Sequence, residues 1–307
     1  MSLQTLPELQ AKIAHCNQLS LNELAPGFAQ LTISNAQAKA RVSLYGAQVL
    51  SFQPAGDSEL LWLSPTARYH QGRSIRGGIP LCWPWFGPHP DDPSKPSHGF
   101  ARHLLWTLDA ASGDEKHTQL EFSLAPQTSN QSLWPHPFEL SLRLSIGRSL
   151  QIELITKNTG HTPMEISAAL HSYFSISDID NISIEGLDGC LFRDAVNEDR
   201  TCKQCGPIRF HGEVDRVYHD TSAAILIDDT VAKRRTRVRK GGSNSTVVWN
   251  PWIDKSAQLG DIPEGGYRHM LCVETANADH NRIALLPNNS HTLYTEITGE
   301  ALEPPLD

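Results

Sequence analysis

The fold is decided by two neighbouring segments, FELSLRLSI at residues 138–146 and LQIELITK at residues 150–157. In both segments apolar and polar side chains largely alternate, which is the pattern of a β-strand with one buried face. The short link Gly147-Arg148-Ser149 joins them, and connections of this length are typical of β-hairpins. The two segments therefore predict a pair of adjacent antiparallel strands.

The same period of two recurs along most of the chain. Strand-like runs separated by turn residues lie at residues 37–45, 47–53, 60–64, 118–125, 164–174, 181–185, 223–227, 234–239, 246–250, 268–275 and 291–297. Strands at this spacing, with no long helices between them, are typical of a sandwich or barrel and argue against a parallel α/β sheet. We therefore expect an all-β fold, either a sandwich or a barrel.

The N-terminal segment has a different pattern. Leu, Ile and Ala recur at near-helical spacing between residues 6 and 24, with Pro7 at the start and Pro26 just past the end. This punctuation predicts a short helical extension over residues 1–25. No linker or shift in composition divides the remainder, so residues 26–307 are expected to form a single domain.

The composition narrows the possible partners. The chain of 307 residues has a net charge of -8, which argues against nucleic acid or an anionic membrane as a general partner. It contains no apolar run long enough for a membrane helix and no signal-peptide pattern at its start. Its six cysteines form no disulfide framework, so we expect a reduced, cytoplasmic protein.

A long irregular stretch at residues 65–96 is rich in Pro, Gly, Trp and His. Loops of this length in compact domains usually have a function. Within it, the segment RGGIPLCWPWFG at residues 76–87 offers Arg76 for a phosphate or carboxylate, and aromatic rings that can pack against a sugar. The same composition also fits a loop whose aromatic rings fill the core. The next motif, HGFAR, places His98 and Arg102 four residues apart, which suits contacts to an anion or a polyol.

Two titratable residues lie within apolar, strand-like runs. With a period of two, His171 shares one face with Ala169 and Tyr173, and histidine can change its charge near neutral pH. Glu274 lies near the end of the apolar run LCVET, where burial would raise its pKa and make it a usable base. Each residue alone also fits a structural role, as a hydrogen-bonded core histidine or an ion-paired glutamate. Rigid strands can hold such an acid and base in register.

Three further features have simpler interpretations. Asp215 can accept hydrogen bonds from sugar hydroxyls, although a local pair with Arg216 explains it as well. Cys202 and Cys205 resemble half of a zinc site, but no second Cys-x-x-Cys motif accompanies them. The basic run at residues 233–240 alternates like a solvated strand, so we favour that interpretation over a nucleic-acid patch. Phosphate-loop, Rossmann, Gly-x-Ser-x-Gly and His-Glu-x-x-His motifs are missing from the sequence.

Together, the motifs resemble those of one family, and they occur in order between about residues 30 and 297. They are RGGIP and PWFG within residues 76–87, HGFAR at 98–102, LHSYF at 170–174, DRVY at 215–218, WNPW at 249–252 and CVE at 272–274. The combination is similar to the glucose-6-phosphate 1-epimerases, hexose-6-phosphate mutarotases of the galactose-mutarotase-like superfamily. The resemblance implies the large antiparallel supersandwich of that superfamily, which agrees with the period-two pattern. The first 25 residues or so lie outside it.

The resemblance also implies roles for individual residues. His171 matches the general acid, and Glu274 matches the general base. Arg76 and Arg102 match basic residues around a substrate phosphate, and Asp215 matches an acidic substrate contact. The implied site also includes His98 and the preceding Ser97, although relatives often carry a longer polar side chain at the latter position.

The implied reaction interconverts the α and β anomers of a hexose 6-phosphate by opening and closing its ring. It would need an ionised Glu274 and a protonated His171 on opposite sides of the ring near neutral pH, with no metal and no organic cofactor. The expected partner is a small sugar phosphate, and the protein is expected to act as a monomer. Two alternatives stay open: a mutarotase for unphosphorylated aldoses, and a non-catalytic carbohydrate-binding protein.

Overall fold

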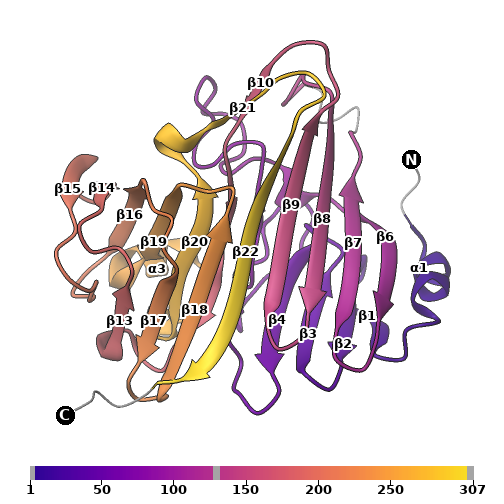
Figure 1. Cartoon of the computed structure of the whole chain (residues 1–307), viewed down its shortest axis with the longest axis horizontal. Coiled ribbons are helices and arrows are strands. Elements are labelled where there is room, and N and C mark those ends of the chain that lie inside the picture. Colours follow the sequence, from indigo (N-terminus) through magenta and orange to yellow (C-terminus); the bar gives the residue numbers. More distant parts are fainter. Residues whose placement is uncertain (1–3, 127–131, 303–307) are drawn as a thin grey trace.

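The computed structural model describes residues 4–126 and 132–302, and nearly all of its regular structure is antiparallel β-sheet (Figure 1). A long sheet of eight strands forms one layer. In spatial order, its strands are β13 (Ile182–Glu185), β17 (Ile225–Asp229), β18 (Arg234–Gly241), β22 (Ser290–Ala301), β9 (Leu150–Asn158), β8 (Phe138–Ile146), β7 (Thr118–Leu124) and β6 (Thr107–Gly113). The hairpin predicted from residues 138–157 is formed by β8 and β9, which pair antiparallel with Ile146 opposite Leu150.

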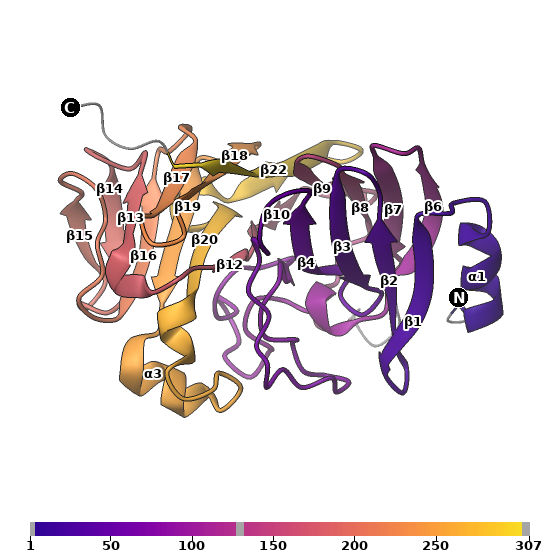
Figure 2. The ribbon, with the colours of Figure 1, turned by 90° about the horizontal axis from the view of Figure 1, so that it is seen from below.

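Two further sheets, of eight and four strands, lie side by side against the long sheet (Figure 2). The first, called here the site sheet, has the order β15 (Arg200–Lys203), β14 (Leu191–Asp194), β16 (Val214–His219), β19 (Ser245–Asn250), β20 (Met270–Asn277), β11 (Ala168–Leu170) and β5 (Leu81–Cys82), with β12 (Tyr173–Ser175) also pairing with β20. The second contains β1 (Leu19–Ala25), β2 (Phe28–Ser34), β3 (Ala38–Ser43) and β4 (Gln48–Pro54). A short ribbon pairs β10 (Met164–Ile166) with β21 (Ile283–Leu285). The expected sandwich is therefore confirmed.

The core lies between the layers because the strands alternate as the sequence indicates. Along β9, fully buried residues alternate with partly exposed ones from Leu150 to Asn158. One apolar cluster extends from Leu9 in the first helix to Ile297 on β22. Burial of apolar surface on this scale is the main stabilising contribution to such a fold.

The N-terminal prediction is half right. Helix α1 spans Leu6–Ile13, and Thr5 caps it together with Glu8 in a reciprocal capping box. The following residues, Leu19–Ala25, were expected to be helical but form strand β1. The reason is pairing, because β1 binds β2 through the turn that contains Pro26 and Gly27. The proposed division at residue 25 stays a prediction.

Other segments also depart from the expectation. Residues 60–64 form isolated bridges at Leu61 and Leu63 instead of a strand. The run 164–174 divides into β10, β11 and β12. Helix α3 (Trp252–Leu259) follows soon after β19. Short 3₁₀ turns complete the regular structure at η1 (Ala101–His103), η2 (Ile179–Asn181), η3 (Gly266–His269) and η4 (Asp279–Asn281).

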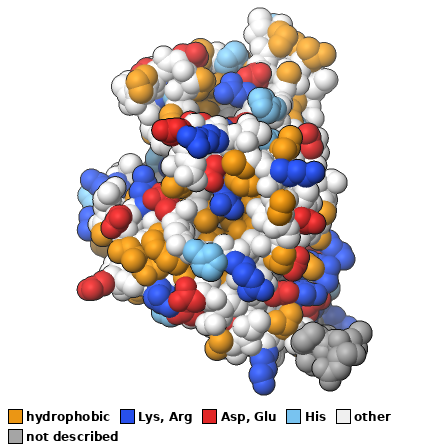
Figure 3. Space-filling model, turned by 90° about the vertical axis from the view of Figure 1, so that its left-hand side faces the viewer, with side chains coloured by type: hydrophobic (Ala, Val, Ile, Leu, Met, Phe, Trp, Pro, Cys, Tyr) orange, Lys and Arg blue, Asp and Glu red, His pale blue; other side chains and the backbone are white. Residues whose placement is uncertain are grey.

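The basic run at 233–240 is not a sheet edge. It forms β18, which pairs with β17 on one side and β22 on the other. Its arginines make ion pairs across these strands, such as Arg235 with Asp228 and Arg237 with Glu300. On the face drawn in Figure 3, basic and acidic side chains are interspersed.

Within residues 4–126 and 132–302, no helix has the length and hydropathy needed to cross a membrane.

Candidate active site

All seven side chains predicted for the site line one pocket of about 400 Å³, a volume in the range of small-molecule sites. The pocket is lined by residues of the site sheet, of α3 and of the loop before η1. Figure 2 shows α3 and the long loops on the side of the site sheet that is away from the long sheet. The predicted residues that it brings together are Arg76, Ser97, His98, Arg102, His171, Asp215 and Glu274. Their chemical roles remain predictions, but their convergence is a feature of the fold.

Strand β20 positions Glu274. Leu271 and Val273 point into the apolar core, whereas Cys272 and Glu274 alternate onto the pocket side of the strand. Glu274 pairs with Val247 on β19, and this register fixes the position of Glu274 along the sheet. A carboxylate that is 2% exposed therefore sits on a rigid central strand.

His171 lies at a break between two short strands, β11 and β12. Its backbone amide donates to the carbonyl of Pro80, which ties it to the loop before β5. The ring stacks on Tyr173 with centroids 4.8 Å apart and an interplanar angle of 6°, and Trp249 packs at 87° to it. The predicted shared face is confirmed, although the strand itself is interrupted.

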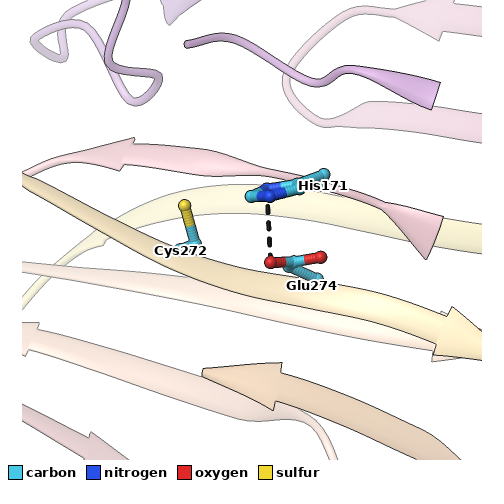
Figure 4. Close-up of side chains that lie close together, drawn as sticks. All are labelled: His171, Cys272 and Glu274. Carbon is cyan, nitrogen blue, oxygen red and sulfur yellow. Dashed lines mark ion pairs between the residues drawn. The ribbon is translucent and has the colours of Figure 1, made fainter. Parts of the chain in front are cut away.

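The acid and the base are direct neighbours. Nδ1 of His171 lies 3.2 Å from Oε1 of Glu274 (Figure 4). Neither Nδ1 of His171 nor the other carboxylate oxygen, Oε2 of Glu274, has a hydrogen-bond partner. We expected the two groups on opposite sides of a sugar ring, and that arrangement is wrong. The anomeric oxygen and the ring oxygen of a hexose are both bonded to C1, so an adjacent acid and base can reach both atoms.

The expected charges of this pair also need correction. Burial lowers the pKa of His171 well below its ordinary value, and neighbouring His98 and Arg102 lower it further. Burial raises the pKa of Glu274 well above its ordinary value, and Asp215 adds to this shift. In the free protein these shifts favour a neutral pair over an ionised Glu274 with a protonated His171.

Two arginines form one wall of the pocket. Arg76 donates from Nε to Asp261 at 3.0 Å and from Nη1 to the hydroxyl of Tyr173 at 2.9 Å. Burial lowers the pKa of Arg76, but Tyr173 and Asp261 outweigh it, so the pKa is raised and the side chain stays charged. Arg102 donates from Nη2 to the carbonyl of Ser97 at 2.8 Å, and its buried Nε has no hydrogen-bond partner.

Between the arginines and His171 lies His98, whose backbone has a positive φ of 63°. The amide of Gly87 donates to Nδ1 of His98 at 3.2 Å, which leaves the proton of the neutral ring on Nε2. Burial, with Arg102 and Arg76 nearby, lowers the pKa of His98 to about 3. His98 is therefore a neutral hydrogen-bond donor at physiological pH.

Asp215 and Lys255 complete the polar lining on the side of α3. Asp215 lies on β16 opposite Trp249, and burial raises its pKa although Arg193 opposes the shift. Lys255 is exposed on α3. The sequence reading did not assign Lys255 or Tyr173 a role. The period-two alternation predicted that Tyr173 is a neighbour of His171. No motif or periodicity near Lys255 indicated that it lines the pocket.

Comparisons with known proteins agree on one kind of protein. A family model described as aldose 1-epimerase matches residues 29–298. A Salmonella typhimurium protein provisionally named glucose-6-phosphate 1-epimerase is 38% identical over 249 residues, 81% of this chain and 83% of its own length. An Escherichia coli K12 protein with the same provisional name is 37% identical over 82% of this chain and 84% of its own length.

Solved structures extend the comparison. The crystal structure of a provisionally assigned mutarotase from Salmonella typhimurium has a TM-score of 0.87 and 34% identity, over 98% of this chain and 96% of that one. A galactose 1-epimerase from Lactobacillus acidophilus has a TM-score of 0.71 at 14% identity, over 93% of this chain and 98% of its own, which is a likeness of fold alone.

Proposed function

The chain belongs to the aldose 1-epimerase family, which makes it an isomerase, and we propose that it interconverts the α and β anomers of glucose 6-phosphate. The observation that carries this proposal is one pocket that combines the buried His171–Glu274 pair with the cations Arg76 and Arg102. The relatives that carry the provisional name glucose-6-phosphate 1-epimerase support the same substrate.

The proposed reaction uses Oε2 of Glu274 and Nε2 of His171. Once the shared proton of the pair has moved from Glu274 to His171, Glu274 takes the proton from the anomeric hydroxyl while His171 gives a proton to the ring oxygen, and the C1–O5 bond breaks to give the open aldehyde. Rotation about C1–C2 presents the other face, and the two proton transfers reverse on closure. Each positioned acid or base typically contributes about 10²–10⁴-fold to such a rate. The short distance between the two side chains supports this assignment, since both target oxygens share one carbon.

Electrostatics supports a phosphorylated substrate. Asp261 partly neutralises Arg76, whereas no ion pair to Arg102 or Lys255 occurs in the described residues. Burial lowers the pKa of His98 to about 3 and the pKa of His171 well below its ordinary value, so neither histidine adds to the positive charge that the arginines supply to the free pocket. Two cations therefore remain without a carboxylate, which suits a phosphate dianion. We propose that Arg102 is the main phosphate contact and that Lys255 adds to it.

The proposal is tested by exchange NMR of the α and β anomers of glucose 6-phosphate and of glucose. We expect exchange well above the spontaneous rate, faster for the phosphate, and abolished by Glu274→Gln. Equal acceleration of both sugars would contradict the phosphate assignment and favour an unphosphorylated aldose. Sugar binding without accelerated exchange would contradict catalysis and indicate a carbohydrate-binding protein.

We also propose that the protein works as a monomer in a reducing, cytoplasmic setting. All six cysteines are free thiols, which is typical of reducing compartments. The seven predicted site residues converge within a single copy of the chain, which supports a site that works in a monomer. Analytical ultracentrifugation of the active protein tests the first point, and a stable dimer would contradict it.

A further inference from the structure

A third side chain accompanies the His171–Glu274 pair. One ring nitrogen of His171, the sulfur of Cys272 and one carboxylate oxygen of Glu274 all lie within 4.8 Å of one another. In Figure 4, Cys272 and Glu274 rise from the same side of β20 toward the ring of His171. No other trio of His, Cys, Asp or Glu side chains in the described parts of the chain comes this close.

These side chains are buried and incompletely satisfied. Cys272 is 0% exposed, Glu274 2% and His171 8%. Nδ1 of His171 and Oε2 of Glu274 make no hydrogen bond, although buried polar atoms in native proteins nearly always have a partner. The reaction proposed above gives Oε2 of Glu274 a role only while sugar is bound, and it uses neither Nδ1 of His171 nor Cys272.

We propose that His171, Cys272 and Glu274 form a binding site for Zn²⁺ that excludes the sugar. Imidazole, thiolate and carboxylate are the ligand types that zinc prefers, at about 2.0–2.3 Å from the metal. Mg²⁺ and Ca²⁺ prefer oxygen ligands, so they should bind far more weakly here. Since His171 and Glu274 also line the pocket, a metal bound to them would lie next to the space that the sugar would occupy.

The charge balance allows such a site. Zinc replaces the thiol proton of Cys272 and the carboxyl proton of Glu274, both of which leave to solvent, and the thiolate and carboxylate together offset the two positive charges of the metal. Arg76 and Arg102 lie in the same pocket and oppose the cation, which limits its affinity. A bound phosphate dianion would be attracted by those arginines instead, so sugar phosphate and zinc should compete.

Inhibition by zinc rests on the proposed function, because the metal would bind the two side chains that transfer protons. Zinc binding itself does not rest on it and can be measured directly. The full chain is prepared with Cys190, Cys202 and Cys205 changed to Ser, because these less buried thiols could bind zinc independently. Zn²⁺ affinity is measured by competition with a chromophoric chelator, and Co²⁺ is added to detect the absorption of a metal–thiolate bond.

We expect one Zn²⁺ per chain, a Co²⁺–thiolate absorption band, and loss of both on Cys272→Ser. Cys16→Ser, which removes another buried thiol far along the chain, should leave both unchanged. If thermal unfolding shows that Cys272→Ser is misfolded, Glu274→Gln serves as the second variant and should weaken Zn²⁺ binding at least tenfold. Absence of stoichiometric zinc, or zinc that survives both variants, would overturn the site.

Anomer exchange in the same background separates the two proposals. Fast exchange that Zn²⁺ inhibits, with relief by glucose 6-phosphate or a chelator, supports both. Fast exchange that saturating Zn²⁺ does not change overturns exclusion of the sugar but leaves the function standing. Stoichiometric zinc on a protein that never accelerates exchange overturns the proposed function and leaves the metal site.

Discussion

At the scale of single residues, His171 and Glu274 form one titrating unit. Their side chains are 3.2 Å apart and both are almost fully buried, so the charge on one depends on the other. The neutral pair and the ion pair contain the same number of protons. They differ only in whether the titrating proton is on the carboxyl group of Glu274 or on the ring of His171. The substrate can therefore shift the proton from Glu274 to His171 without uptake from solvent.

This coupling predicts a bell-shaped dependence of kcat on pH. At low pH the pair gains a second proton and activity is lost. Burial places the pH of this loss below the ordinary histidine pKa of 6.5. At high pH the pair loses its proton, and burial places that loss well above the ordinary glutamate value of 4.5. Exchange NMR at saturating glucose 6-phosphate from acid to alkaline pH measures both limbs. An acid limb centred above pH 6.5 would contradict the expected direction for His171.

Arg102 provides the residue-level test of substrate choice. Because charge-assisted hydrogen bonds typically contribute about 1.5–3 kcal/mol, Arg102→Ala should raise the KM for glucose 6-phosphate by about 10–100-fold. The rate with unphosphorylated glucose should change little. The control is Arg143→Ala, an exposed arginine on β8 outside the pocket. An equal loss for both sugars would show that Arg102 supports the pocket instead of recognising phosphate.

At the scale of elements, the loop before η1 is held against the aromatic loop by close backbone packing. Trp83 and Gly99 form a parallel bridge, and the amide of Phe100 donates to the carbonyl of Trp83. Gly99 has a φ of +71°, and a Cβ there would overlap the carbonyl oxygen of Trp83. This contact fixes where His98 and Arg102 enter the pocket.

Gly99→Ala should therefore reduce both stability and activity. Gly87→Ala is the matched control, because Gly87 has a similar φ of +75° but a Cβ there would meet nothing within 4 Å. Backbone strain alone typically costs about 1–3 kcal/mol, so Gly87→Ala measures that part of the effect. Urea denaturation and exchange NMR on both variants separate strain from displacement of the site. Similar losses in the two variants would contradict a role for the Trp83 contact.

At the scale of the whole molecule, the pocket rests on contacts between the layers. Trp83 is 0% exposed and its indole Nε1 donates to the hydroxyl of Thr156 on β9, so it joins the pocket loop to the long sheet. Its ring also packs against Phe100 and Phe138. The long sheet thus acts as a common platform for the site sheet and the loops above it.

Trp83→Ala should destabilise the protein by about 3–5 kcal/mol, the usual range for a buried tryptophan. Trp83→Phe should cost less, because most of the ring volume is retained. Its remaining cost comes from the lost hydrogen bond to Thr156. Chemical denaturation gives both values. If Trp83→Ala unfolds at the same urea concentration as the wild-type protein, the proposed connection between the layers is wrong.

Much of the fold could be predicted because strand periodicity is local. The alternation in β8 and β9 identifies both the strands and their buried faces, and the short link predicts their pairing. β1 was mistaken for helix because its apolar residues fit both periods, and only its pairing with β2 decides between them. A strand has no backbone hydrogen bonds of its own, so its existence depends on a partner that local sequence does not identify.

The sequence by itself determined the all-β architecture and, through ordered motifs, the residues that could act as acid, base and cation. Tertiary structure alone decided that Arg76 and Glu274, nearly two hundred positions apart, line one pocket. It also decided that Glu274 touches His171 instead of facing it across a sugar, and it added Cys272 beside them. The physical reason is that pKa values, charge balance and metal affinity depend on distance and burial, and both arise only when the strands have paired and the layers have packed.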